Sequence, residues 1–212
     1  MKDIPVFTTE NGVASLTLRE IPYSRKAYFR IQLASDAASL IKECVDFCRA
    51  VGAEEIYATG DASLKDYPVH TEILEMRALR SKLPDTDTII EPLYESQLSE
   101  FQSIYNAKMR NVPNSAYFTI QDAKAVFDKH SGYRILSNDE LIGIGIASGD
   151  TIEMLASLLP EKGCDVICAL SKTLQSDEIR LVVADTNYKA IRLYERLGFK
   201  VFSNIGKWYK IF

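Results

Sequence analysis

The sequence predicts an α/β protein, and three observations support this fold class. Residues 178–199 read as a short β-branched strand, a polar break, an amphipathic helix and the start of another strand. Strand-like and helix-like segments alternate through the rest of the chain. The 212 residues are 47% apolar and 25% charged, which is ordinary for a globular protein in water.

The first half of the chain has four segments with a clear pattern and one ambiguous segment. Ser35 or Asp36 is a plausible N-cap and Gly52 a plausible C-cap for the helix in this half. Residues 71–79 fit a strand or a helix. The clear segments, in order, are strand 13–18, strand 27–33, helix 37–50 and strand 55–59.

A polar segment with a proline, residues 82–87, is the best candidate for a linker. It divides the chain into two predicted domains, 1–83 and 86–212. After it, apolar residues recur with alternating strand and helix periods. The predicted elements are strand 89–93, helices 98–109 and 120–128, strands 133–136, 141–147 and 151–159, helix 164–174, strand 179–184, helix 190–197 and a strand from 199.

Residues 185–187 (Asp-Thr-Asn) can each cap the last helix, and Gly198 can end it in a left-handed conformation. An ordinary amphipathic helix with a glycine cap explains Leu193, Leu197 and Gly198. It does not explain the rest of a longer pattern. That pattern consists of Asn187, Ala190, Leu193, Tyr194, Glu195, Leu197, Gly198 and Phe199.

This pattern resembles the N-x-x-A-x-x-L-Y-E-x-L-G-F signature of the GCN5-related N-acetyltransferases (GNATs). The resemblance covers roughly residues 86–212. It implies a GNAT-like fold, with a mixed, mostly antiparallel central sheet flanked by helices. Residues 1–83 are then an accessory or degenerate GNAT-like half-domain. Cys-x-x-x-Cys followed later by Glu-Ile occurs in both halves, a weak hint of an internal repeat.

The resemblance also implies an activity, the transfer of an acetyl group from acetyl-CoA to an amine of a small molecule or peptide. By analogy, the backbone amides near residues 155–158 polarise the thioester carbonyl, which makes Leu155, Ser157 and Leu158 candidate cofactor-binding residues. Asn187 corresponds to the residue that binds the pantetheine arm, although a helix N-cap explains it equally.

Two residues are candidates for acid–base chemistry by the same analogy. Glu153 is the carboxylate on the strand where the family often places its general base, although it can also be a solvated strand residue. Tyr194 corresponds to the acid that protonates the departing thiolate, and it can also be a packed aromatic. The family's acceptor region corresponds to Tyr105–Phe118, and this segment indicates no particular amine as the acceptor. Its polar residues include Asn106, Lys108, Arg110, Asn111 and Asn114.

The phosphate-binding loop departs from the family pattern R-G-x-G-x-G/A. Lys162 and Gly163 keep one basic residue and one glycine, and they are the candidate contacts to the pyrophosphate. Asp165 and Ile167 replace the later small residues, and an aspartate there repels a pyrophosphate. This departure keeps a second hypothesis open, a catalytically inactive GNAT-fold sensor or partner-binding module.

Composition argues against several other classes. The net charge of −4 gives no electrostatic case for a nucleic-acid partner, and no apolar run approaches the length of a membrane span. Residues 1–7 do not resemble a signal peptide, so the expected location is cytoplasmic.

Two i, i+4 cysteine pairs, 44/48 and 164/168, favour buried free cysteines over a zinc site, and no metal is expected. His70 and His130 stand in unrelated parts of the sequence, with no other candidate ligand or catalytic residue at a suitable spacing. A homodimer is one option for the oligomeric state.

Overall fold

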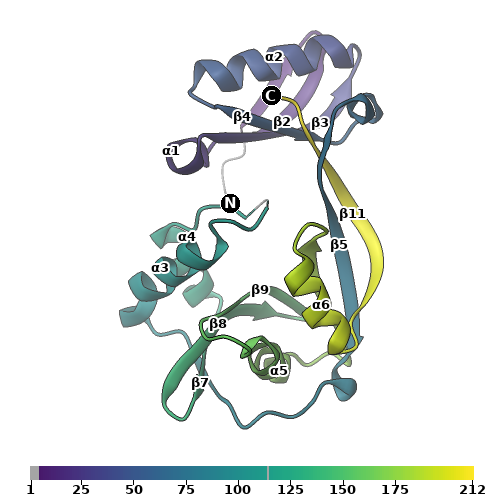
Figure 1. The fold of residues 1–212 in the computed structure, drawn as a ribbon. Helices are drawn as coiled ribbons and strands as arrows, with labels where there is room; N and C mark the ends of the chain where they lie inside the picture. Colours follow the sequence, from purple (N-terminus) through teal and green to yellow (C-terminus); the bar gives the residue numbers. More distant parts are fainter. Residues whose placement is uncertain (1–4, 114) are drawn as a thin grey trace. The chain divides into compact units, whose positions relative to one another are not determined.

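The computed structural model describes residues 5–113 and 115–212 (Figure 1). Residues 1–4, which belong to the segment tested for a signal peptide, lie outside the described part. The chain divides into two compact units. Unit 1 comprises Met1–Glu72 and Gly206–Phe212, and unit 2 comprises Ile73–Ile205. Strands β5 (Val69–Leu79) and β11 (Lys200–Lys210) contribute residues to both units.

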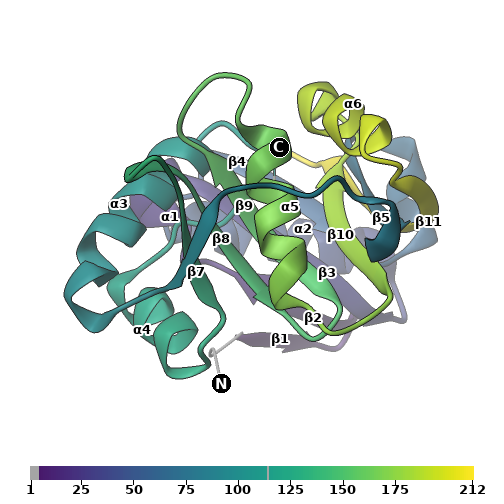
Figure 2. The same ribbon diagram turned by 90° about the horizontal axis from the view of Figure 1, so that it is seen from below.

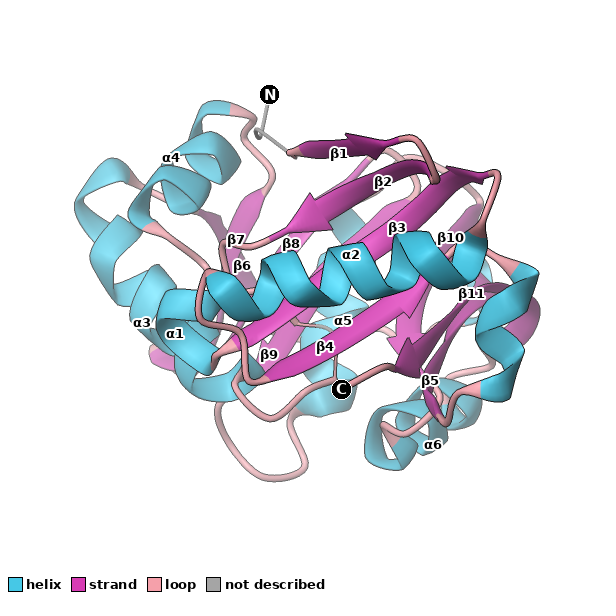
Figure 3. Cartoon of the chain, turned by 90° about the horizontal axis from the view of Figure 1, so that it is seen from above, coloured by secondary structure: helices cyan, strands magenta, loops and turns pink. Residues whose placement is uncertain are grey.

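Unit 1 is a sheet with one long helix packed on it (Figure 3). The helix α2 buries Leu40, Ile41, Cys44 and Cys48 against the strands. Asp36 caps it, with its side chain accepting a hydrogen bond from the Ser39 N–H at 3.1 Å. The elements are β1 (Val6–Thr9), β2 (Gly12–Thr17), α1 (Ile21–Ser24), β3 (Lys26–Ala34), α2 (Ala37–Ala50), β4 (Glu55–Thr59) and the 3₁₀ turn η1 (Ala62–Asp66).

The strand order in unit 1 is β1-β2-β3-β4-β11. The strands β2 and β3 are antiparallel neighbours, as their alternating apolar residues predict. The strands β3 and β4 are parallel, because α2 carries the chain back to the same edge before β4 begins. The strand β1, which pairs with β2, was not predicted from the sequence.

Unit 2 contains the remaining elements in the predicted order. They are β6 (Ile89–Pro92), α3 (Leu98–Met109), α4 (Ile120–Asp128), β7 (Gly132–Ser137), β8 (Glu140–Ser148), β9 (Thr151–Ser157), α5 (Gly163–Thr173), β10 (Glu178–Ala184) and α6 (Tyr188–Arg196), with 3₁₀ turns η2 (Arg80–Lys82) and η3 (Glu95–Gln97). The strand order is β11-β5-β10-β9-β8-β7-β6. All neighbours with a described register are antiparallel except β9 and β10. The predicted mixed, mostly antiparallel sheet flanked by helices is confirmed.

Helices cover both faces of the sheet in unit 2 (Figure 2). The helix α5 lies on β8 and β9, in one apolar core with Leu181 and Phe199. The helices α3 and α4 pack on the opposite face, against Ile144 and Met154. Gly145 allows α5 to approach β8 closely, because a Cβ at this position would overlap the Leu170 side chain.

The ambiguous segment 71–79 lies within strand β5, which pairs with β10 over seven residue pairs. The proposed linker is held against α5. Lys172 forms an ion pair with Asp85 at 2.6 Å and donates a hydrogen bond to the Thr86 carbonyl at 2.7 Å. The predicted boundary between domains 1–83 and 86–212 stays a prediction. The compact units divide the chain at 72/73 and 205/206.

Candidate active site

The strands β9 and β10 begin as parallel neighbours and then separate. Their pairing joins Arg180 with Thr151 and Leu181 with Ile152, and the described strands make no further pairs although both continue for three residues or more. Each strand keeps its other neighbour, β8 for β9 and β5 for β10. The result is a fork in the sheet whose inner edges have unpaired backbone groups.

The direction of each amide along β9 follows from one hydrogen bond. The Leu158 N–H donates to the Ile142 carbonyl of β8 at 2.8 Å. Since successive N–H groups alternate in direction along a strand, those of Leu155 and Ser157 point to the opposite side, toward the fork. The predicted role for the Leu158 amide is therefore wrong, because this amide belongs to the β8–β9 ladder. Leu155 and Ser157 remain the candidate donors.

Glu153 lies at the branch point of the fork. It directly follows Ile152, the last residue of β9 that pairs with β10. The β8–β9 register passes from Ile146↔Met154 to Ala147↔Ile152, so Glu153 has no partner on β8 and is the extra residue of a β-bulge. Bulges redirect a side chain and are frequent beside active sites. The Glu153 side chain is exposed and accepts a hydrogen bond from the Ser148 hydroxyl at 2.6 Å.

The loop between β9 and α5 carries little free positive charge. Lys162 precedes α5 and forms an ion pair with Asp165, in the first turn of the helix, at 2.8 Å. Glu161 adds a second carboxylate and has a φ of 63°, a left-handed conformation that glycine adopts without strain. Two acids and one engaged lysine do not fit a pyrophosphate at this helix start, which agrees with the degenerate sequence.

Gly163 is closely packed against α6. A Cβ on this residue would lie 2.7 Å from Leu193 Cδ2, so α6 approaches the first turn of α5 closely. The contact joins the loop region to the helix of the signature stretch. Among the described residues, no glycine other than Gly163 is available in this loop for a close backbone approach to a ligand.

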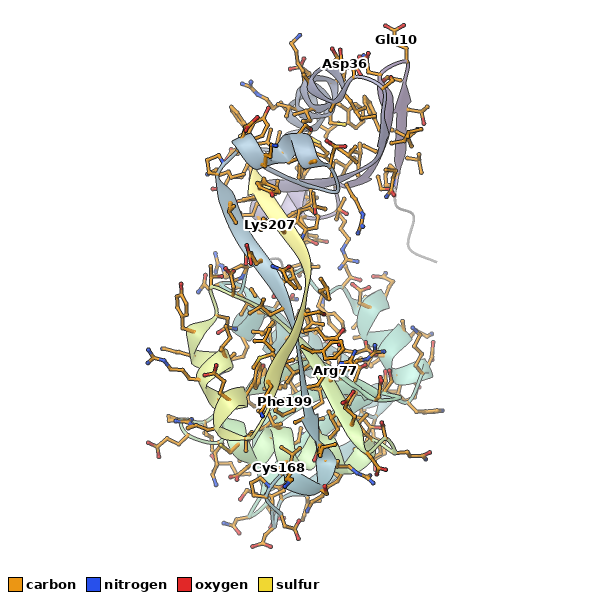
Figure 4. The ribbon with its side chains drawn as sticks, turned by 90° about the vertical axis from the view of Figure 1, so that its right-hand side faces the viewer. Glu10, Asp36, Arg77, Cys168, Phe199 and Lys207 are labelled. Atoms are coloured by element: carbon orange, nitrogen blue, oxygen red, sulfur yellow. The ribbon has the colours of Figure 1, made fainter. Side chains whose placement is uncertain are left out.

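Tyr194 lies in the core between α6 and the sheet. Its side chain is 7% exposed, and its ring centroid is 5.9 Å from that of Phe199, which Figure 4 labels just before β11. Burial raises the pKa of the Tyr194 hydroxyl to about 12, because the charged phenolate is poorly solvated there. The hydroxyl has no hydrogen-bond partner among the described residues, so it is a protonated donor without a fixed acceptor.

Asn187 caps α6, and its side-chain oxygen accepts a hydrogen bond from the Ala190 N–H at 3.3 Å. The capping role expected from its position is confirmed. Gly198 has a φ of 88° and follows the helix as expected for a left-handed C-terminal residue. The side-chain amide of Asn187 still has its N–H groups for a ligand.

No family model and no curated protein matches the sequence. Solved structures match nearly the whole chain. A functionally unknown conserved protein from Staphylococcus epidermidis is 12% identical, with a TM-score of 0.61 over 98% of this chain and 93% of its own.

A GCN5-related N-acetyltransferase from Sphaerobacter thermophilus is 12% identical, with a TM-score of 0.58 over 95% of this chain and 77% of its own. A tandem GNAT protein from the clavulanic acid biosynthesis pathway, described without AcCoA, is 10% identical, with a TM-score of 0.51 over 94% and 77%. The chain has the GNAT fold. Both matches cover 94% or more of the chain and so include residues of both units.

Several contacts join α3 to the end of the predicted acceptor region, residues 105–118. Asn106 of α3 exchanges two hydrogen bonds with the Phe118 backbone, at 2.8 and 2.9 Å, and Gln102 donates a third to the Phe118 carbonyl at 3.1 Å. The rings of Tyr105 and Phe118 stack with centroids 4.3 Å apart. Lys108 donates to the Leu158 carbonyl at 3.4 Å, which joins α3 to the end of β9. Asn114 lies outside the described residues.

The cysteines and histidines lie in separate parts of the described chain. All four cysteines are free; Cys44, Cys48 and Cys168 are buried, and burial raises the pKa of Cys48 and Cys168 to about 11. The described residues contain no group of histidine, cysteine and acidic side chains that could hold a metal. The ring of His70 lies 4.2 Å from that of Tyr57 in unit 1, tilted by 38°, and His130 ends the turn after α4. Within residues 5–113 and 115–212, no helix has the length and apolar character that crossing a bilayer requires.

Sequence reasoning missed two features of this site. The bulge at Glu153 leaves no local signal in the alternation of β9, because it depends on the register with β8. The left-handed backbone of Glu161 is the second feature. It is a property of the folded loop, and a glutamate at this position gives no sequence signal for it.

Proposed function

We propose that this protein is an N-acyltransferase that moves an acetyl group from acetyl-CoA to an amine of a small molecule or peptide. The observation that carries the proposal is the fork between β9 and β10. It leaves the Leu155 and Ser157 N–H groups unpaired at the inner edge of an otherwise paired sheet. A native sheet rarely leaves such donors without a partner unless a ligand or water accepts from them.

The fork fits the thioester end of the co-substrate. Acetyl-CoA, when bound, supplies an activated thioester whose carbonyl oxygen gains negative charge as the bond to nitrogen forms. Donors fixed by a strand stabilise such charge without reorganising, so Leu155 N–H or Ser157 N–H would accelerate the transfer. The loop at 161–165 does not fit the pyrophosphate end, since its acids outnumber its one lysine.

Glu153 is the proposed general base. Its bulge turns it out of the regular ladder at the branch point of the fork, and it is exposed, so an amine can reach it directly or through one water. Ser148 donates to one carboxylate oxygen and leaves the other free to accept the proton. The amine must lose this proton before or during its attack on the carbonyl.

Tyr194 is the proposed donor to the departing sulfur. Its pKa of about 12 keeps it protonated at neutral pH. A thiol has a pKa near 8.5, so complete proton transfer from the phenol is uphill by about 5 kcal/mol. We therefore assign Tyr194 a hydrogen bond to the leaving thiolate rather than full protonation.

The alternative is a GNAT-fold module that binds a partner without catalysis. The acidic loop favours it, because Glu161 and Asp165 oppose phosphate binding where the signature glycines are missing. Cofactor binding separates the two hypotheses, since they share the packing residues of the fold.

The test is thermal unfolding of the full chain with acetyl-CoA at increasing concentration, beside ATP as a control for non-specific anion binding. At 100 times its Kd, a ligand of the native state adds about 2.7 kcal/mol, which predicts a rise in Tm of roughly 5–10 °C. A panel of amines then tests turnover by release of free thiol. No shift with acetyl-CoA at roughly millimolar concentration would leave the non-catalytic module as the better hypothesis.

A further inference from the structure

The outer side of α6 carries three basic residues without partners. Lys189, Arg192 and Arg196 are exposed, and among the described residues none of the three forms an ion pair. They stand at positions that the signature stretch leaves open, so the resemblance does not account for them. Surface cations of this kind are free to bind an anion.

These residues share one side of the helix. Positions 189, 192 and 196 are three and four apart, which places them in a row along an α-helix. The row spans about 10 Å at 1.5 Å per residue. Leu193 borders the row, since it is four residues after Lys189 and three before Arg196.

The row lies beside the start of α5. Leu193 Cδ2 would be 2.7 Å from a Cβ on Gly163, so the neighbours of Leu193 on α6 are close to the first turn of α5 (Figure 2). The N–H groups of that turn have no helical partners and carry partial positive charge. The carboxylates of Glu161 and Asp165 offset this charge on the loop side, while α6 adds positive charge from its own side.

The local charge contrasts with that of the chain. Between residues 188 and 196, three basic residues and the single acid Glu195 give a net charge of +2 (3 − 1), whereas the whole chain has a net charge of −4. A positive row on an acidic protein, beside a helix start, favours a ligand with several negative charges.

We propose that Lys189, Arg192 and Arg196 bind the phosphate groups of the acyl-CoA, in place of the degenerate loop between β9 and α5. This inference rests on the proposed function. Its chemistry is the attraction between two or three exposed cations and the pyrophosphate and ribose phosphate of CoA, spread along a row long enough for more than one phosphate. The loop then needs no further basic residue, and Lys162 remains paired with Asp165.

The experiment is calorimetric titration of the full chain with acetyl-CoA and with acetyl-pantetheine, which has the same thioester arm but no phosphates. The test variant is Arg192→Glu/Arg196→Glu. The matched control is Lys124→Glu/Lys129→Glu, which makes the same charge change at two exposed residues of α4 and the turn after it. Thermal unfolding without ligand verifies that each variant folds.

We expect the test variant to raise the Kd for acetyl-CoA roughly 10- to 100-fold and to leave that for acetyl-pantetheine unchanged, with the control within about threefold of wild type. The salt dependence of acetyl-CoA binding falls in the same variant. Equal Kd values for acetyl-CoA in wild type and test variant overturn the inference alone, as does an equal loss for both ligands. A wild-type protein that binds no acetyl-CoA overturns the proposed function as well.

Discussion

In unit 1 the parallel strands β3 and β4 pair along all five residues of β4, whereas in unit 2 the parallel strands β9 and β10 pair at two positions and then separate. The two regions share two features of local sequence. Each pair is connected through a helix with a Cys-x-x-x-Cys pair, and β4 and β10 both begin with Glu-Ile. These two shared features therefore do not decide whether a pair of parallel strands stays paired along its length.

The difference lies in the outer neighbours of each pair. In unit 2, β8 supports β9 along its length, and β5 supports β10 over seven residue pairs. In unit 1, β4 meets β11 at two pairs, Tyr209↔Ala58 and Lys210↔Tyr57, so most of its ladder is with β3. In unit 2 the outer neighbours hold β9 and β10 where these two strands separate from each other.

The largest expected effect comes from proline substitutions that distinguish paired from unpaired amides. Ala156→Pro removes an N–H that points to β8, and Ala58→Pro disrupts β4; we expect each to cost roughly 3 kcal/mol of unfolding free energy. Ser157→Pro removes an N–H that points into the fork and costs roughly 1 kcal/mol. Urea unfolding of the wild type and the three variants measures the loss of unfolding free energy in each variant. Equal losses at 156 and 157 would mean that the fork is closed.

A smaller effect on rate is expected at the branch point. Glu153→Gln keeps the shape and can still accept from Ser148, but it cannot take a proton from the amine. We expect kcat to fall about 100-fold, with the unfolding free energy changed by less than about 0.5 kcal/mol because the residue is exposed. Steady-state kinetics beside Glu140→Gln, an exposed glutamate at the start of β8, is the measurement. An unaltered kcat would mean that Glu153 is an exposed strand residue and not the general base.

The smallest effect is expected for Tyr194→Phe. The hydroxyl has no partner among the described residues, so its removal changes the unfolding free energy by less than about 0.5 kcal/mol. Loss of the hydrogen bond to the leaving sulfur lowers kcat by about tenfold, equivalent to about 1.4 kcal/mol. Tyr188→Phe, on the exposed side of the same helix, is the control. Full activity of Tyr194→Phe would make this residue a core aromatic alone.

Elements with strong local signals were predictable from the sequence. The helix α2 shows apolar spacing, an Asp36 cap and Gly52 at its end, and the prediction matched its bounds at 37–50. In α6, Asn187 and Gly198 marked both ends. These signals act within one turn of the chain, so the sequence alone contains them.

Features set by distant pairing were not predictable. The segment 71–79 stayed ambiguous because Leu74, Met76 and Ala78 face the core only once β5 is paired with β10, more than a hundred residues later. The same holds for the Glu153 bulge and for the Leu158 amide, which the fold directs to β8. The fork itself was expected only through the GNAT resemblance.

The position of β5 has a practical consequence for anyone who divides this chain for expression. A fragment that starts at residue 86 omits β5, although the polar segment before it invites such a cut. In that fragment β10 would lose its partner β5 and keep two pairs with β9. It would then present an unpaired hydrogen-bonding edge beside the apolar side chains of Leu181 and Val183. The polar segment is itself joined to α5, because Lys172 pairs with Asp85 and donates to the Thr86 carbonyl.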